Sequence, residues 1–269
     1  MALTASFPMY DLPEVRDALD TIWEGIAQRL RQRGVADVPG ALLHGRALPQ
    51  LWSNPSLLIS QCCGYDVVGR YAGRLRPIAT PRYSAPGCEG SQYSSAVLVN
   101  ATNKATELEH LRHSVCAING PESHSGMNAL RALLAPLSRE GRFFAEVKIS
   151  GGHPESIAMV TGGETDVCAI DCVTYALLQR YRPESVRGTR LLCYTESAPG
   201  LPYVTRTETD ERLVTHVQSA LVEAFEDETV QSACEQVFIS GVELLPPAAY
   251  ERITELEQTA IRHGYPDIL

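Results

Sequence analysis

The sequence predicts an α/β protein with two lobes, on three observations. Short apolar runs alternate with helical patterns along most of the chain, and polar, hydroxyl-rich segments directly follow several of these runs. Two stretches rich in Pro and Gly, residues 86–98 and 196–202, indicate that the chain leaves one lobe and later returns to it. We therefore expect one lobe over residues 1–97 and 197–269 and a second over residues 98–196. Each should be a mixed, mainly parallel sheet flanked by helices.

Composition and charge limit the classes of function. The chain has 269 residues, is 44% hydrophobic and carries a net charge of −9 without any run of Lys or Arg, which argues against a nucleic-acid or anionic-membrane surface. No window approaches the roughly 18 continuous apolar residues of a membrane span, so membrane insertion is not expected. Residues 1–10 lack the basic and apolar regions of an export signal. This predicts a cytoplasmic location as the chain stands, or a periplasmic one if a leader was removed.

The chain opens with a predicted strand, cap and helix. An apolar segment at residues 5–10 precedes Asp11, which is expected to cap the first helix, and Pro13 suits the first turn of that helix. Gly34 is expected to end it. Apolar residues at mainly three- and four-residue spacing mark its buried face: Val15, Leu19, Ile22, Trp23, Ile26 and Leu30.

Alternation of strands and helices continues after this helix. Trp23 and Trp52 are assigned to the core. Further strands are expected at residues 41–43, 57–61, 75–80, 94–99, 114–118, 144–149, 167–170, 191–195 and 203–205. Helices are expected at residues 47–52, near 105–111, after Ser125, after His153, and finally at 210–225 and 247–263.

The most informative feature is a pair of hydroxyl-rich segments that lead into helices. Residues 119–128, Asn-Gly-Pro-Glu-Ser-His-Ser-Gly-Met-Asn, precede an apolar run at 129–137, and residues 150–156 precede one at 157–160. The first turn of a helix has backbone N–H groups without intrahelical partners and the positive end of the helix dipole, which suit an anion. Ser and Asn before a helix are also ordinary N-caps, so a purely structural role stays open.

Other polar residues at predicted strand ends have two interpretations each. His153, between Gly152 and Pro154, is either a ligand contact or an exposed loop residue. Asp171 is either a helix cap or a ligand contact, and Gln61 either satisfies neighbouring backbone groups or contacts a ligand. Ligands of open α/β sheets lie at the carboxyl ends of strands, where these residues are placed.

In their order and spacing, these segments resemble the phosphate/phosphonate-type substrate-binding proteins of ABC transporters, which have the type 2 periplasmic-binding fold. The resemblance runs from residues 9–11 to about Pro202 and is less specific in the closing helices. Its most telling segments are residues 123–128, 150–156, 166–171 and 198–202. The family pattern often has Ser-Thr-Ser-Gly at the anion loop, whereas His124 lies between the serines here, so the identity of the anion stays open.

The resemblance implies a two-lobed clamp, joined by two crossing segments, that closes on a small anion such as phosphate, phosphonate or a related oxyanion compound. By position, the ligand-binding residues would be Ser123, Ser125, Gly126, His153 and Asp171, with Tyr10, Gln61 and Tyr93 as wall residues of the other lobe. It implies an ABC permease as partner, and no cofactor, metal or catalytic residue.

Two other classes of function stay open. One is an enzyme with Cys62 or Cys63 as nucleophile and His153 as base. The other is a cytosolic ligand sensor or accessory protein with the same clamp. The eight cysteines show no C-x-x-C spacing, so a zinc ribbon is not expected. A disulfide between Cys63 and Cys88 is conceivable in an oxidising compartment.

Overall fold

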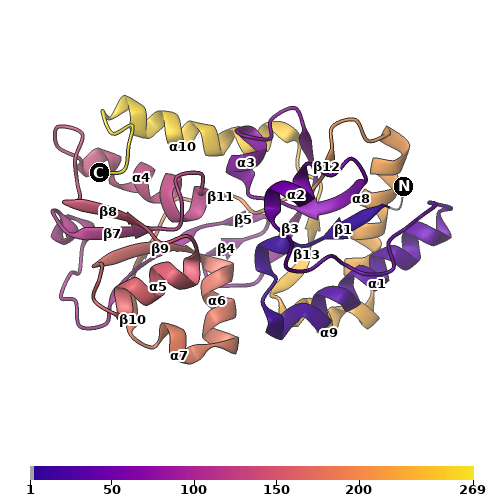
Figure 1. Ribbon diagram of the computed structural model, residues 1–269, viewed down its shortest axis with the longest axis horizontal. Coiled ribbons are helices and arrows are strands. Elements are labelled where there is room, and N and C mark those ends of the chain that lie inside the picture. The colour runs from indigo at the N-terminus through magenta and orange to yellow at the C-terminus, as the bar shows by residue number, and fades with distance from the viewer. Residues whose placement is uncertain (1–2) are drawn as a thin grey trace. The chain divides into compact units, whose positions relative to one another are not determined.

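The computed structural model describes residues 3–269, which form two compact units (Figure 1). Unit 1 comprises the chain up to Ser84, Glu89–Ser91 and Pro199–Ala249. Unit 2 comprises Ala85–Cys88, Gln92–Ala198 and Tyr250–Leu269. The units differ from the predicted lobes mainly at the C-terminus, since residues 250–269 pack with unit 2. That the lobes act as a clamp remains a prediction.

Unit 1 is built on a five-stranded mixed sheet with the order β1-β2-β12-β3-β13. Only β1 and β2 are parallel. Its strands are β1 (Thr4–Ser6), β2 (Leu57–Gln61), β3 (Leu75–Tyr83), β12 (Tyr203–Arg206) and β13 (Ile239–Glu243). Its helices are α1 (Arg16–Gln32), α2 (Leu48–Trp52), α3 (Gly64–Val68), α8 (Glu211–Phe225) and α9 (Glu228–Gln236), with α1 packed against α8 and α9.

Helix α1 forms on the predicted apolar stripe, and all six residues of the stripe are buried. The predicted capping role of Asp11 is wrong. Its carboxylate accepts hydrogen bonds from Arg16 Nε at 2.8 Å and from the backbone N–H of Gly45 at 3.0 Å. Asp11 therefore ties the start of α1 to the following loop, and a short 3₁₀ turn, Pro13–Val15, separates it from the helix.

Unit 2 is built on a second five-stranded sheet with the order β10-β6-β9-β7-β8. Strands β9, β7 and β8 are parallel to one another, whereas β10-β6 and β6-β9 are antiparallel pairs. The strands are β6 (Ser95–Asn100), β7 (Val115–Ile118), β8 (Glu146–Ile149), β9 (Val167–Asp171) and β10 (Thr189–Tyr194). The helices are α4 (Ala129–Leu134), α5 (His153–Thr161), α6 (Cys172–Tyr181), α7 (Pro183–Val186) and α10 (Glu251–Arg262). Helix α10 packs on α4.

A third, small sheet of order β11-β5-β4 is made of segments near the points where the chain passes between the units. Its strands are β4 (Cys88–Glu89), β5 (Gln92–Tyr93) and β11 (Ala198–Pro199).

The structure corrects three further predictions about the elements. The sheets are mixed but not mainly parallel, because antiparallel pairs predominate. Residues 41–43 form no strand, although Leu43 donates one backbone hydrogen bond to Ala5 at 2.8 Å. The helix expected near 105–111 is a 3₁₀ turn at Leu108–Leu111. Elements that were not predicted include α3, α7, α9 and β13. A strand that is covered on both faces is an apolar run whether its neighbours are parallel or antiparallel to it. The sequence alone therefore did not distinguish parallel from antiparallel pairs.

Candidate functional site

Three helix starts of unit 2 lie at the carboxyl ends of its three parallel strands. Strand β7 leads to the segment 119–128, β8 leads to residues 150–152 and α5, and β9 leads directly into α6. The carboxyl ends of neighbouring parallel strands share one edge of a sheet, which is where ligands of α/β proteins bind. This edge is therefore the candidate site.

The first helix start is a capped π-helical turn, His124–Asn128, that continues into α4. The side chain of Ser123 accepts a hydrogen bond from the backbone N–H of Gly126 at 3.0 Å. Ser125, two residues into the segment, is 6% exposed. A Cβ atom on Gly126 would lie 1.8 Å from Asn119 Oδ1, so this close approach requires glycine.

The second helix start is held against the first by the backbone. Ser150 donates its N–H to the carbonyl of Ile118 at 2.8 Å, and Gly151 donates to that of Asn119 at 3.1 Å. Gly151 has φ +92°, in the left-handed region that favours glycine. The hydroxyl of Ser150 also lies 2.7 Å from that of Ser156, inside α5.

His153, the first residue of α5, joins all three helix starts. Its Nε2 lies 2.9 Å from Ser125 Oγ and 3.5 Å from the backbone nitrogen of Asp171. A backbone N–H can only donate, which makes Nε2 an acceptor and places the proton of the neutral ring on Nδ1. His153 Nδ1 is buried and has no hydrogen-bond partner among residues 3–269.

Burial lowers the pKa of His153 to about 4, although the residue keeps some exposed surface. A pKa below 6.5 leaves the ring neutral at pH 7. The Nδ1–H of this neutral imidazole is therefore a hydrogen-bond donor that has no acceptor among the described residues.

Asp171 caps the third helix start. Its Oδ1 accepts hydrogen bonds from the backbone N–H groups of Val173 at 2.8 Å and Thr174 at 2.9 Å, and the residue is 2% exposed. The capping role considered for Asp171 is thus present in the structure. A contact between its carboxylate and a ligand remains a prediction.

The Ser125–His153 pair does not have the arrangement of a catalytic triad. In a triad, a carboxylate accepts the Nδ1–H of the histidine and orients the ring. Here Nδ1 has no such partner among residues 3–269, and the Asp171 carboxylate accepts from backbone N–H groups instead.

His124 is part of an internal network that the sequence did not predict. Its Nδ1 accepts from Asn128 Nδ2 at 3.1 Å, and Asn128 Oδ1 accepts from Arg131 at 2.8 Å. Asn128 Nδ2 also lies 3.2 Å from the carbonyl oxygen of Ile253. Burial lowers the pKa of His124 to about 4, so it too is neutral at pH 7. The ring of Tyr93 lies 6.0 Å from that of His124, centroid to centroid.

Of the three wall residues predicted for the other lobe, Tyr93 lies in unit 2 instead. Gln61 and Tyr10 lie in unit 1 around Tyr83, which the sequence did not single out. Gln61 Nε2 donates to Tyr83 Oη at 3.0 Å and to the carbonyl of Leu201 at 3.2 Å. The rings of Tyr10 and Tyr83 are 5.4 Å apart and nearly perpendicular. Gln61 therefore satisfies neighbouring groups, as one of its two interpretations required, and its role toward a ligand stays a prediction.

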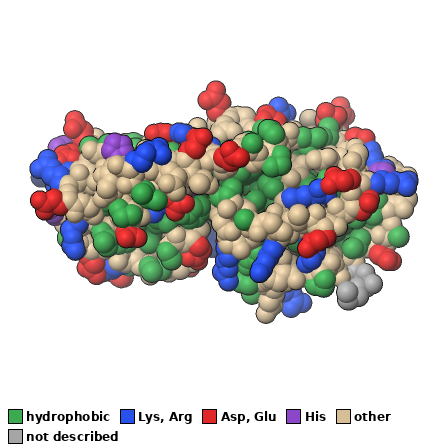
Figure 2. All heavy atoms as spheres, turned by 90° about the horizontal axis from the view of Figure 1, so that it is seen from above, with side chains coloured by type: hydrophobic (Ala, Val, Ile, Leu, Met, Phe, Trp, Pro, Cys, Tyr) green, Lys and Arg blue, Asp and Glu red, His purple; other side chains and the backbone are tan. Residues whose placement is uncertain are grey.

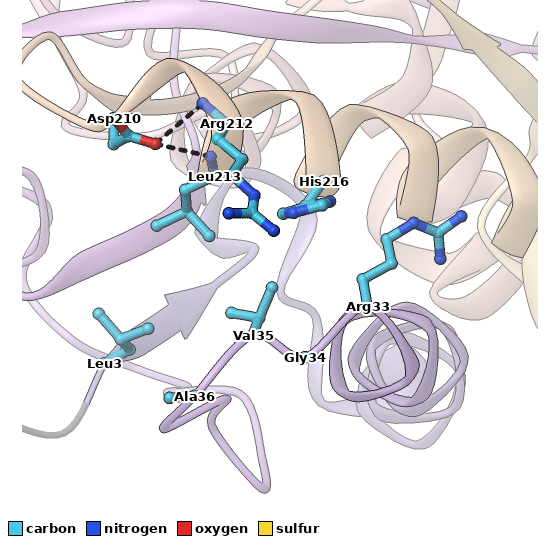
Figure 3. A pocket seen from close by; sticks show the side chains of 9 residues that line it. All are labelled: Leu3, Arg33, Gly34, Val35, Ala36, Asp210, Arg212, Leu213 and His216. Carbon is cyan, nitrogen blue, oxygen red and sulfur yellow. Dashed lines mark hydrogen bonds between the residues drawn. The ribbon is translucent and has the colours of Figure 1, made fainter.

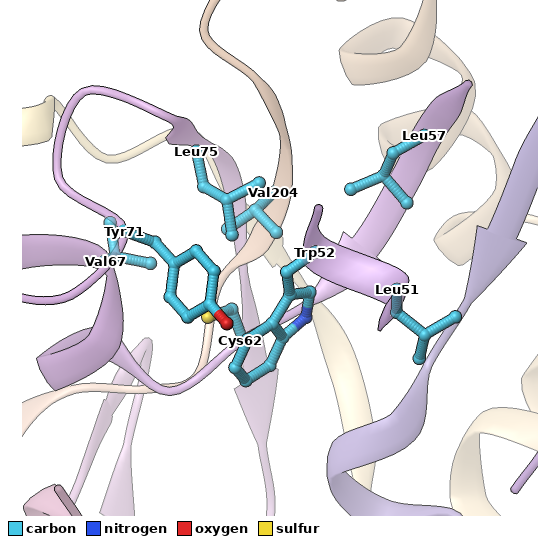
Figure 4. Packing of buried hydrophobic residues seen from close by; sticks show 8 residues of the cluster. All are labelled: Leu51, Trp52, Leu57, Cys62, Val67, Tyr71, Leu75 and Val204. Carbon is cyan, nitrogen blue, oxygen red and sulfur yellow. The ribbon is translucent and has the colours of Figure 1, made fainter. Parts of the chain in front are cut away.

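The predicted nucleophile Cys62 is a core residue of unit 1. It is fully buried in an apolar cluster, where Figure 4 shows its sulfur beside Trp52 and Tyr71. Burial raises the pKa of its thiol well above the ordinary value. A thiol that stays protonated is a poor nucleophile, which removes the support for Cys62 in the enzyme hypothesis.

A surface hollow of about 340 Å³ lies elsewhere in unit 1 (Figure 3). Arg33, Arg212 and His216 contribute to its lining, together with Asp210, which caps α8 through the backbone N–H groups of Arg212 and Leu213. Arg33 is paired with Glu223. None of the predicted site residues lines this hollow, so it is not the site predicted from the sequence.

The surface charges agree with a ligand held by local groups. On the face in Figure 2, acidic and basic side chains are interspersed rather than gathered by sign. No helix within residues 3–269 is both long and apolar enough to cross a membrane. Over the same residues, no cluster of three or more His, Cys, Asp or Glu side chains could hold a metal ion.

Comparisons with known proteins identify a family. The family model described as "ABC transporter, phosphonate, periplasmic substrate-binding protein" matches residues 62–250. Comparison with curated proteins finds no match.

Solved structures show the fold. A structure of PhnD1 from Prochlorococcus marinus in complex with methylphosphonate is 14% identical, with a TM-score of 0.75 and coverage of 97% of this chain and 98% of that one. A binding protein component of an ABC phosphonate transporter from Pseudomonas aeruginosa is 14% identical, with a TM-score of 0.73 and coverage of 98% and 87%. XAC2383 from Xanthomonas citri, bound to ATP, is 18% identical, with a TM-score of 0.72 and coverage of 98% of both chains. Such similarity establishes a type 2 periplasmic-binding fold.

Proposed function

Because the chain belongs to the family of periplasmic substrate-binding proteins of phosphonate ABC transporters, we propose that it binds a small phosphonate- or phosphate-type anion at the three helix starts of unit 2. The observation that carries the proposal is the 2.9 Å contact between Ser125 Oγ and His153 Nε2. It brings together two helix starts that lie in separate, hydroxyl-rich segments of the sequence. The first two helix starts contribute backbone N–H groups and a positive dipole end, whereas at the third the Asp171 carboxylate already accepts from the N–H groups of Val173 and Thr174.

The chemistry of these groups suits oxygens that carry negative charge. The hydroxyl of Ser125 can turn from His153 Nε2 to an anion oxygen, and the Nδ1–H of His153 is a second donor. Hydrogen bonds to a charged ligand are worth about 1.5–3 kcal/mol each, roughly twice a neutral one. A protein of net charge −9 attracts no anion at long range, so close donors must supply the affinity.

Two residues are proposed to set the selectivity of the site. The carboxylate of Asp171 would contact an amino or other polar group of the ligand, and the ring of Tyr93 would contribute to the wall. Ser123 and Gly126 would contribute through the turn that they form together. Gln61 and Tyr10, in unit 1, complete the set of proposed contacts.

Titration calorimetry with methylphosphonate and inorganic phosphate tests the proposal, with sodium chloride at matched ionic strength as control. We expect saturable binding of at least one of the two anions, accompanied by a rise in melting temperature that grows with ligand concentration. If neither anion binds at millimolar concentration, the proposed ligand class is wrong.

Delivery to an ABC permease is the proposed physiological role, in a compartment outside the inner membrane. A cytosolic sensor would use the same anion site and differ only in its partner. Fractionation of cells with an antibody to the native protein separates these roles. Recovery in the periplasmic fraction supports transport, and recovery in the cytosol supports the sensor.

A further inference from the structure

Two cysteines far apart in the sequence lie with their sulfur atoms side by side in unit 2. Cys88 Sγ is 3.3 Å from Cys172 Sγ. Cys88 begins β4 and is half-buried, whereas Cys172 is the first residue of α6 and is buried. All eight cysteines are free. The pair conceivable from the sequence was Cys63 with Cys88, but the sulfur found beside Cys88 is that of Cys172.

The backbone around the pair fixes this approach. Gly87 has φ +96°, and a Cβ atom there would lie 2.7 Å from Tyr194 Cε1 and 3.0 Å from the Cβ of Cys172. Ser94 bridges the two segments, since its N–H donates to the carbonyl of Gly87 at 3.0 Å and its carbonyl accepts from the N–H of Cys172 at 3.2 Å. Glycine at position 87 is thus required for the two thiols to meet.

We propose that Cys88 and Cys172 are a redox site that closes to a reversible disulfide when the protein meets a small disulfide oxidant. The sulfur atoms need to approach by only about 1.2 Å to reach the length of an S–S bond. The proposal does not depend on the nature of the ligand.

The exposure of the two residues sets the order of the steps. Cys88, as the half-buried residue, loses its proton to solvent and attacks one sulfur of the oxidant, which releases one equivalent of thiol and leaves a mixed disulfide. Cys172 then loses its proton and attacks Cys88 Sγ, which forms the internal bond and releases the second equivalent. Two protein thiols and one oxidant disulfide become one protein disulfide and two small thiols.

The neighbours of Cys172 are consistent with its acting second. The hydrogen bond with Cys88 is the main cause that raises the pKa of the Cys172 thiol, and burial is the second. The mixed disulfide at Cys88 removes the first cause, so Cys172 loses its proton more readily after that step than before it. The bond would link the segment before Tyr93 to the residue after Asp171. Both of those residues belong to the set proposed to contact the ligand.

The experiment counts thiols in the full chain. The reduced protein is incubated with oxidised glutathione, quenched in acid, denatured and titrated for free thiols. We expect six of the eight thiols to remain, a cross-linked peptide pair containing Cys88 and Cys172 on non-reducing digestion, and recovery of all eight with dithiothreitol. Eight titratable thiols after oxidation, or a bond between other cysteines, would overturn the proposal.

Matched variants keep the test decisive. Cys88→Ser replaces the half-buried cysteine of the pair and should abolish the cross-linked peptide. After oxidation, this variant should have the melting temperature of the reduced parent. Cys193→Ser, at another half-buried cysteine, should still lose two thiols on oxidation. If Cys193→Ser prevents the loss and Cys88→Ser does not, the redox site has been assigned to the wrong residues.

Discussion

The hydroxyl of Ser125 lies 2.9 Å from Nε2 of His153, although 28 residues separate them in the sequence. Ser125 is the second residue of the helical turn that follows β7, and His153 is the first residue of the helix that follows β8. A contact between two helix starts places two sets of backbone donors around one point. Donors that converge in this way favour an anion as the ligand.

Ser125→Ala is expected to weaken the binding of methylphosphonate or phosphate by about 10- to 100-fold, because one hydrogen bond to a charged ligand is lost. Calorimetry of the variant and the parent measures the change. Ser185→Ala is the matched control, since that hydroxyl is exposed and bonds only locally, to the carbonyl of Arg182. Equal affinities for Ser125→Ala and the parent would remove Ser125 from the site.

Asp171→Asn separates the two roles of this residue. Asparagine keeps the oxygen that accepts from the start of α6, so the free energy of unfolding should stay within about 0.5 kcal/mol of the parent. Asp171→Ala should lose about 1 kcal/mol with the cap. If the carboxylate contacts an amino group of the ligand, Asp171→Asn lowers affinity for amino-bearing phosphonates while affinity for methylphosphonate is retained. Equal losses for both ligands would contradict that contact.

Gly126→Ala should destabilise the protein by about 1–3 kcal/mol, because the new methyl group meets Asn119 Oδ1 in a packed turn. Urea denaturation measures the free energy of unfolding. Gly40→Ala is the control, since a Cβ atom there has nothing within 4 Å and the backbone needs no left-handed conformation. A Gly126→Ala protein as stable as the parent would show that Asn119 moves aside freely.

Acid should destabilise the protein through His124. Its pKa is lowered from 6.5 to about 4 by burial, so the unfolded chain binds a proton more readily than the folded protein. The stability that this residue contributes is complete above about pH 6.5, decreases as pH falls from there, and stops decreasing below about pH 4. The loss is at most about 3 kcal/mol.

Urea denaturation between pH 7.5 and 4 checks this expectation. His124→Gln should reduce the slope of the free energy of unfolding against pH over that range. His263→Gln, at an exposed residue directly after α10, should not change this slope. A parent protein with the same free energy of unfolding at pH 7 and pH 5 would contradict the assignment of a neutral, buried His124.

The sequence predicted the helix starts because their chemistry is local. Ser123 caps the turn before α4, as its position before an apolar run indicated, and the family suggested by the resemblance is confirmed by the match over residues 62–250. A helix start after Asp171 was also expected, since this residue was considered as a cap, and α6 begins there at Cys172. Its length was not predicted.

Contacts between distant segments could not be predicted in the same way. No local pattern shows that Asn119 lies against Gly126, that His124 bonds to Asn128 inside unit 2, or that Cys88 meets Cys172. The direction of a strand cannot be predicted from a local pattern either, because a buried strand is apolar whichever way it runs. The eight proposed ligand contacts remain predictions until a ligand is titrated.

The attachment of the C-terminal segment to unit 2 has a consequence for synthesis of the protein. Asn128 bonds to the carbonyl of Ile253, and Arg131 bonds to that of Pro266. The helix that Ser123 caps is thus completed by residues that are synthesised 125 and 135 positions after their partners. We expect unit 2, which carries the helix starts, to stay unfinished until residues 253–266 have been synthesised, and therefore to need protection from aggregation during that interval.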